Sequence, residues 1–136
     1  MIKLIVGNKG SGKTKTLIGM INEAAKNSPG NVVCIEKGSK LTYDIPHSIR
    51  LVDTEHYGIS CYDAFYGFVA GLFAGNYDIT DIYVDSILKV GGKDLEALAN
   101  LIDRLSALCE ETHARMVFTG SADKEELPAA LAELAL

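Results

Sequence analysis

The sequence predicts an α/β fold of three layers, in which helices cover both faces of a mostly parallel five-stranded sheet. Short runs of apolar and β-branched residues alternate along the chain with segments of helical periodicity. That alternation is typical of parallel sheets, whose strands are buried on both faces and joined by helical crossovers. The segment Asp94–Glu111 repeats leucine and isoleucine at three- and four-residue intervals, as an amphipathic helix does. With no linker or repeat in the chain, we expect one domain over residues 1–136.

Five apolar runs are expected to form the sheet, each bounded by residues that favour turns. The expected strands are Ile2–Val6, Asn31–Glu36, Ser48–Asp53, Ile79–Asp85 and Ala114–Gly120. Asn31–Glu36, which reads "NVVCIE", is a clear example, because its continuous apolar character suits a strand covered on both faces. A polar loop, Lys37–His47, should connect it to the next strand.

Four helices are expected between and after these strands. They are about Lys13–Lys26, then Ser60–Tyr77, Asp94–Glu111 and a short final helix over Pro128–Leu136. The first should end at "NSPG", since Pro and Gly together stop a helix. The second carries Gly67, Gly71 and Gly75, which weaken it and create a face that another backbone can approach. We expect "LKVGGK", Leu88–Lys93, to be a loop.

Composition excludes several classes of protein. The chain has 136 residues, 48% of them hydrophobic and 23% charged, which is ordinary for a globular domain. Its net charge of -5 opposes non-specific binding to nucleic acid or anionic lipid. The three cysteines are widely spaced, so neither a disulfide framework nor a zinc ribbon is indicated. No apolar run is long enough to span a bilayer. We therefore expect a cytoplasmic protein that does not enter a membrane.

The glycine-rich stretch after the first expected strand predicts a phosphate-binding loop. It reads "GNKGSGKT" and matches the pattern G-x-x-x-x-G-K-[ST] between a strand and a helix. Glycines allow the loop to turn its N–H groups inward, and the helix N-terminus adds positive charge. A plain turn would need one or two glycines but no Lys-Thr at the helix start. The predicted nucleotide-binding residues are Gly7, Asn8, Lys9, Gly10, Ser11, Gly12, Lys13, Thr14 and Lys15.

On these residues the sequence resembles the P-loop NTPase superfamily, whose Walker A motif this loop matches. In layout it is most similar to small RecA-like ATPases. The resemblance implies binding of a nucleoside triphosphate with Mg²⁺, with Lys13 at the β- and γ-phosphates and Thr14 as a magnesium ligand. Guanine-specific members carry an Asn-Lys-x-Asp motif, which is missing here, so ATP is the expected nucleotide.

The second part of such a site is a magnesium-positioning acid, called Walker B, and it is expected at the end of a neighbouring strand. Asp85, which closes "DIYVD", is the best match, because parallel strands end at the same edge of the sheet. Asp53 is its competitor, and a turn or capping role is the alternative for both. Many ATPases continue Walker B as Asp-Glu, whereas Ser86 follows Asp85 here.

Hydrolysis also needs a group that activates water. RecA-like ATPases place a catalytic glutamate at the end of the strand after the P-loop helix, and Glu36 occupies that place. A surface charge beside Lys37 is the alternative for Glu36. Thr119 resembles a sensor residue at the γ-phosphate, although Ser121 or Asp123 next to it can equally cap the following turn. The predicted catalytic residues are Lys13, Glu36, Asp85 and Thr119.

The arginines offer no obvious finger for the transition state. Arg50 and Arg115 begin their strands, at the edge opposite the phosphates, and Arg104 could act only on a neighbouring copy in an oligomer. Turnover should therefore be slow. The sequence predicts a slow Mg-ATPase that acts as a homo-oligomer or on a protein partner. Two alternatives stay open: a nucleotide-dependent switch module with little hydrolysis, and a small-molecule kinase with its acceptor near Tyr57–Tyr66.

Overall fold

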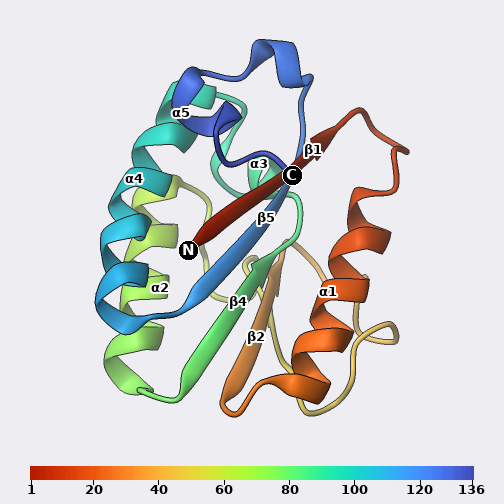
Figure 1. The fold of residues 1–136 in the computed structure, drawn as a ribbon, viewed down its shortest axis with the longest axis vertical. Helices are drawn as coiled ribbons and strands as arrows, with labels where there is room; N and C mark the ends of the chain where they lie inside the picture. Colours follow the sequence, from red (N-terminus) through yellow and green to blue (C-terminus); the bar gives the residue numbers. More distant parts are fainter.

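The computed structural model describes residues 1–136 and shows an α/β fold built on a single sheet (Figure 1). The sheet has five strands in the order β1-β5-β4-β2-β3, and every neighbouring pair is parallel. The predicted α/β class and five-stranded sheet are confirmed. The strands are β1 (Ile2–Gly7), β2 (Asn31–Glu36), β3 (Arg50–Asp53), β4 (Ile79–Val84) and β5 (Arg115–Ser121).

Helices lie on both faces of the sheet. Helix α1 packs alone against one face, whereas α2 and α4 lie side by side over the other (Figure 1). None of the helices has the length and apolar character needed to cross a membrane. The helices are α1 (Lys13–Asn27), α2 (Tyr62–Gly75), α3 (Ile87–Gly91), α4 (Leu95–Thr112), the 3-10 turn η1 (Lys124–Glu126) and α5 (Ala129–Ala132).

The second half of the central strand β4, Ile82–Val84, is apolar at every position. Side chains alternate between the two faces of a strand. Ile82 and Val84 therefore join the core under α2 and α4, while Tyr83 between them joins the core under α1. Phe65 of α2 and Leu17 of α1 are fully buried on these two opposite sides. Because both faces of the sheet are covered, this part of the strand needs apolar side chains on both sides.

The loop between β2 and β3 differs from the polar connection that we predicted. Leu41, Ile45 and Ile49 are buried and pack with α1 residues, so this loop completes the core that α1 alone leaves open. The strand after it begins at Arg50 rather than Ser48, because Ile49 turns into that core instead of joining the ladder.

Two further predictions about local structure were wrong. The expected loop Leu88–Lys93 contains most of the short helix α3, whose Ile87 and Val90 are buried. The expected final helix Pro128–Leu136 shortens to Ala129–Ala132. Leu134 and Leu136 instead bond to the main chain of Leu4 in β1, at 3.0 and 2.9 Å. That pairing covers the open edge of the sheet, which would otherwise invite other strands.

The face of α2 that carries its three glycines has no other part of the chain packed closely against it. A Cβ placed on Gly67, Gly71 or Gly75 would meet no atom within 4 Å, so the expected close approach of another backbone does not occur within the domain.

The start of α2 and the loop after α3 are held together by one buried aromatic ring. A Cβ at Gly91 would lie 2.1 Å from the Tyr62 ring, so only glycine allows this contact. The Tyr62 hydroxyl donates a hydrogen bond to the Gly92 carbonyl. Burial, with a smaller contribution from Asp94, raises the pKa of Tyr62 to about 12, so the hydroxyl stays protonated and can donate at any working pH.

Replacing Tyr62 by phenylalanine should lower the free energy of unfolding by about 1 kcal/mol, because one hydrogen bond is lost while the ring packing is kept. Urea unfolding followed by circular dichroism measures this. Tyr43→Phe is the matched control, since the Tyr43 side chain is 99% exposed and bonds to nothing. Equal stability of the two variants would contradict the anchoring role.

Candidate functional site

The polar residues predicted for the site lie at the carboxyl edge of the sheet. All five strands are parallel, so the loops after them meet at this one edge. The strand order places β5 between β1 and β4. The glycine loop after β1, Thr119 near the end of β5 and Asp85 after β4 are therefore neighbours, although they are far apart in sequence.

The glycine loop has the backbone geometry for which glycine is suited. Gly10 and Gly12 have φ angles of 86° and 85°, a region that other residues rarely adopt. Gly7 is required for a different reason, because a Cβ there would lie 2.6 Å from the Ser11 hydroxyl. The loop is closed by the Ser11 N–H, which donates to the Asn8 carbonyl at 3.1 Å.

The first turn of α1 presents free donors at the end of this loop. Gly12 is its N-cap and has no side chain to cap the helix. The N–H groups of Lys13, Thr14 and Lys15 have no acceptor within the protein. Lys13 turns back over the loop, where its Nζ donates to the Asn8 carbonyl at 2.9 Å and lies 3.5 Å from the Ser11 hydroxyl. Unpaired N–H groups and a helix N-terminus together favour an anion.

Three side chains from separate elements meet beside the loop. The hydroxyls of Thr14 and Thr119 donate to the same Asp85 oxygen, Oδ1, at 3.1 and 2.8 Å. The Thr119 hydroxyl in turn accepts the Ser86 N–H at 2.7 Å. The backbone of Asp85 is also fixed, because its N–H donates to the Ile35 carbonyl of β2 at 2.9 Å. These bonds fix Asp85 and Thr119, which are 9% and 1% exposed, at the head of α1.

A cleft of about 360 Å³ opens at the glycine loop and the first turn of α1. Four lysines line it and no carboxylate does, so its potential is positive. The chain's ion pairs are Arg104–Asp63 and Arg115–Asp81, and none of the cleft's lysines is paired. We call it the lysine cleft. It is lined by Lys9, Gly10, Gly12, Lys13, Thr14, Lys15, Ser86, Lys89 and Ser121.

Glu36 does not line this cleft. It is 2% exposed, and its Oε2 accepts the N–H of Leu41 at 2.9 Å, which holds the start of the β2–β3 loop. Burial raises the pKa of Glu36, the Leu41 bond lowers it, and the nearby Asp85 raises it further. Glu36 is therefore a buried carboxyl that ties a loop, and not the exposed strand-end charge that was the alternative in the sequence.

The Glu36→Gln variant should gain stability relative to the wild type as the pH rises. A carboxyl whose pKa is raised by folding stabilises the protein only while it is protonated, so its contribution is lost above the ordinary value of about 4.3. Glutamine keeps an oxygen for the Leu41 N–H but does not titrate. Urea unfolding between pH 4.5 and 7.5 measures the difference. Glu110→Gln, at an exposed position, should run parallel to the wild type.

Asp53, the competitor of Asp85, is occupied by its own loop. Its Oδ1 accepts the N–H groups of Gly38 and Glu55 at 2.8 and 2.9 Å. The Gly38 bond is the main reason why the pKa of Asp53 is lowered. These bonds match the turn role that the sequence left open, and Asp85 is the acid that contacts the glycine loop.

The arginines are engaged elsewhere. Arg104 bonds to Asp63 at 3.0 Å and lies 4.0 Å above the Tyr66 ring, which clamps α4 to α2. Arg115 contacts Asp81 and the Tyr83 hydroxyl at the opposite edge of the sheet. Arg50 donates to the Tyr57 hydroxyl. The free cations at the carboxyl edge are therefore lysines.

Sequence reasoning placed the loop, Asp85 and Thr119 together but missed Ser86. Its N–H bonds to Thr119, and its φ of 56° is unusual for a residue other than glycine. No pattern in the sequence signals such a conformation. No protein-family model and no curated protein matches the chain, so the geometry of the site carries the functional argument.

Proposed function

We propose that the protein binds Mg-ATP in the lysine cleft and hydrolyses it slowly, as a small P-loop ATPase of RecA-like layout. The observation that carries this proposal is the shared bond of Thr14 and Thr119 to Asp85, directly beside the unpaired N–H groups of α1. A turn that only connects a strand to a helix does not need a buried acid bonded to the first helical turn. A site for a metal-bound polyphosphate needs both an acid near the metal and unpaired N–H groups for the phosphates.

The phosphates are expected to lie over the glycine loop. The N–H groups of Lys13, Thr14 and Lys15 would donate to phosphate oxygens, and Lys13 would move from the Asn8 carbonyl to the β- and γ-phosphates. Lys9 and Lys89 supply further positive charge from the walls of the cleft. The Cβ-free positions 10 and 12 leave the space above the loop open.

The donor set suits magnesium. Mg²⁺ prefers hard oxygen ligands and binds through one or two protein groups plus phosphate and water. The Thr14 hydroxyl and the Asp85 carboxylate are such groups, and they already lie 3.1 Å apart. Bound there, the ion would neutralise phosphate charge in the transition state. Thr119 would hold Asp85 in position from the other side.

Thr119 keeps its proposed role as a sensor at the γ-phosphate. It lies near the end of β5, the strand between β1 and β4, and its hydroxyl bonds to Asp85 next to the glycine loop. Glu36 remains the proposed water-activating group, but it would have to leave the Leu41 N–H to reach water in the cleft. That requirement, together with the lack of a free arginine, is consistent with slow turnover.

The buried position of Glu36 favours a second candidate function, a nucleotide-dependent switch with little hydrolysis. In that case Glu36 only secures the loop after β2, and ATP changes the surface around the lysine cleft. A partner protein would bind to one form of that surface and not to the other.

Isothermal titration of ATP, GTP and ADP with Mg²⁺, run beside a phosphate-release assay on the wild type and Glu36→Gln, tests the proposal. Binding of ATP, with release that stops in Glu36→Gln, supports the ATPase. Binding without release above background supports the switch. If none of the three nucleotides binds, the glycine loop is only a turn and both functions are wrong.

A further inference from the structure

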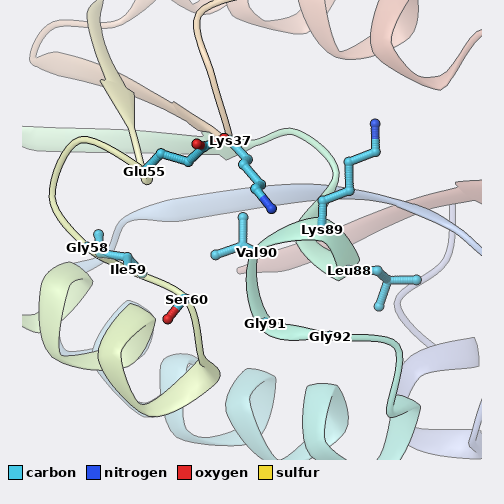
Figure 2. Close-up of a pocket in the computed structure, with 10 residues that line it drawn as sticks. All are labelled: Lys37, Glu55, Gly58, Ile59, Ser60, Leu88, Lys89, Val90, Gly91 and Gly92. Carbon is cyan, nitrogen blue, oxygen red and sulfur yellow. The ribbon is translucent and has the colours of Figure 1, made fainter.

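A second pocket opens at the carboxyl edge, on the far side of Asp85 from the glycine loop. Its volume is about 520 Å³, within the range of pockets that hold small molecules. The loops after β2 and β3 form one wall, and α3 with the turn after it forms the other (Figure 2). We call it the α3 pocket. Its lining residues are Lys37, Glu55, Gly58, Ile59, Ser60, Leu88, Lys89, Val90, Gly91 and Gly92.

Both walls of the α3 pocket are held in place by specific contacts. The Tyr62 ring packs against Gly91 and its hydroxyl bonds to the Gly92 carbonyl, which fixes the turn after α3. On the other wall, Asp53 accepts the N–H groups of Gly38 and Glu55 and so ties the two strand-end loops together. The pocket is therefore formed before any ligand arrives, which lowers the cost of binding.

The lining predicts the chemistry of the ligand. Ile59 and Val90 are buried and form an apolar floor. Figure 2 shows the Lys37 side chain directed toward Val90, with the Glu55 carboxylate turned toward Lys37. Lys37 belongs to no ion pair, whereas Figure 2 shows the Lys89 side chain extending away from Lys37 and Glu55. The Lys37 ammonium can therefore receive an anionic group, while Glu55 and the Ser60 hydroxyl can accept from a hydroxyl or amine of the same molecule.

The α3 pocket adjoins the lysine cleft, because Lys89 lines both. We propose that it binds a second substrate-sized molecule beside the nucleotide: a small organic acid or phosphate monoester that also carries a hydroxyl or amino group. This inference rests on nucleotide binding in the lysine cleft, and it adds a ligand class that the glycine loop does not specify.

Inorganic phosphate is the simplest probe of the anionic part of this site. We would titrate it into ¹⁵N-labelled protein saturated with Mg-ADP and follow the amide signals by NMR. Shifts should appear at Gly58, Ser60, Gly91 and Gly92. Lys37→Ala should weaken this binding roughly tenfold, because a charged hydrogen bond is lost, and Lys37→Arg should restore it. Lys26→Ala, which removes an exposed lysine at the far end of α1, is the matched control and should bind phosphate as the wild type does.

Three results would overturn the inference. The first is a shift of only the amides of residues 9–15, which would place phosphate in the lysine cleft. The second is that Mg-ADP alone shifts the amides of Ser60 and Gly91 and blocks further shifts, which would assign the α3 pocket to the nucleotide. The third is that Lys37→Ala binds phosphate as tightly as Lys26→Ala. If Mg-ADP itself does not bind, the proposed function fails, and the same titration on the free protein still tests the α3 pocket.

Discussion

Replacing Lys13 by alanine should weaken Mg-ATP binding roughly a hundredfold or more. A lysine ammonium on the β- and γ-phosphates makes charge-assisted hydrogen bonds, which are about twice as strong as neutral ones, in a cleft that no carboxylate lines. The bond of Lys13 to the Asn8 carbonyl stays within its own loop, so its loss should leave the fold intact. Isothermal titration of wild type and variant measures the affinity, and thermal unfolding without nucleotide checks the fold.

Lys26→Ala is again the matched control, because it removes the same charge from the last turn of the same helix. It should keep the wild-type affinity, since salt screens charges over about 10 Å. A loss of affinity in Lys26→Ala as large as in Lys13→Ala would show that net charge, and not a contact of Lys13, attracts the nucleotide. An affinity of Lys13→Ala within threefold of the wild type would contradict the proposed site.

Features that depend on local sequence were predictable. The strand β2 has a continuous apolar run and the helix α4 has periodic apolar residues, and such patterns reflect which faces are buried. The glycine loop is a local motif whose residues require unusual φ angles at Gly10 and Gly12. The contact between Thr14 and Asp85 was also predictable, because the strands before the glycine loop and before Asp85 are parallel and therefore end at the same edge of the sheet.

Features that depend on packing between distant segments were not predictable. The Glu36 carboxyl is buried because the loop after it folds back onto α1 through Leu41 and Ile45. The α3 pocket depends on a contact between Tyr62 and Gly91 that neither local sequence reveals. Contacts between distant segments therefore fix the position of Glu36 and the walls of the α3 pocket, which the local sequence does not determine.

Replacing Asp85 by asparagine should abolish the magnesium dependence of ATP binding and slow phosphate release roughly a hundredfold. Asparagine has nearly the same shape, and its oxygen can still accept the hydroxyls of Thr14 and Thr119. The change therefore removes a charge and keeps the local packing. A metal ion contributes several kcal/mol of charge stabilisation in the transition state, which corresponds to a hundredfold or more in rate. Titrations of ATP with Mg²⁺ and with EDTA, beside a phosphate-release assay, measure both effects.

The matched control for Asp85→Asn is Asp53→Asn, at the other strand-end acid. Its carboxylate is bonded to backbone N–H groups and does not touch the glycine loop, so magnesium dependence should be unchanged. If Asp53→Asn removes the magnesium effect and Asp85→Asn does not, the metal lies between β2 and β3, and the bond of Thr14 to Asp85 is only a structural tie. If both variants keep it, magnesium is bound through phosphate and water alone. The contrast between the two acids therefore tests the one contact on which the proposed function depends.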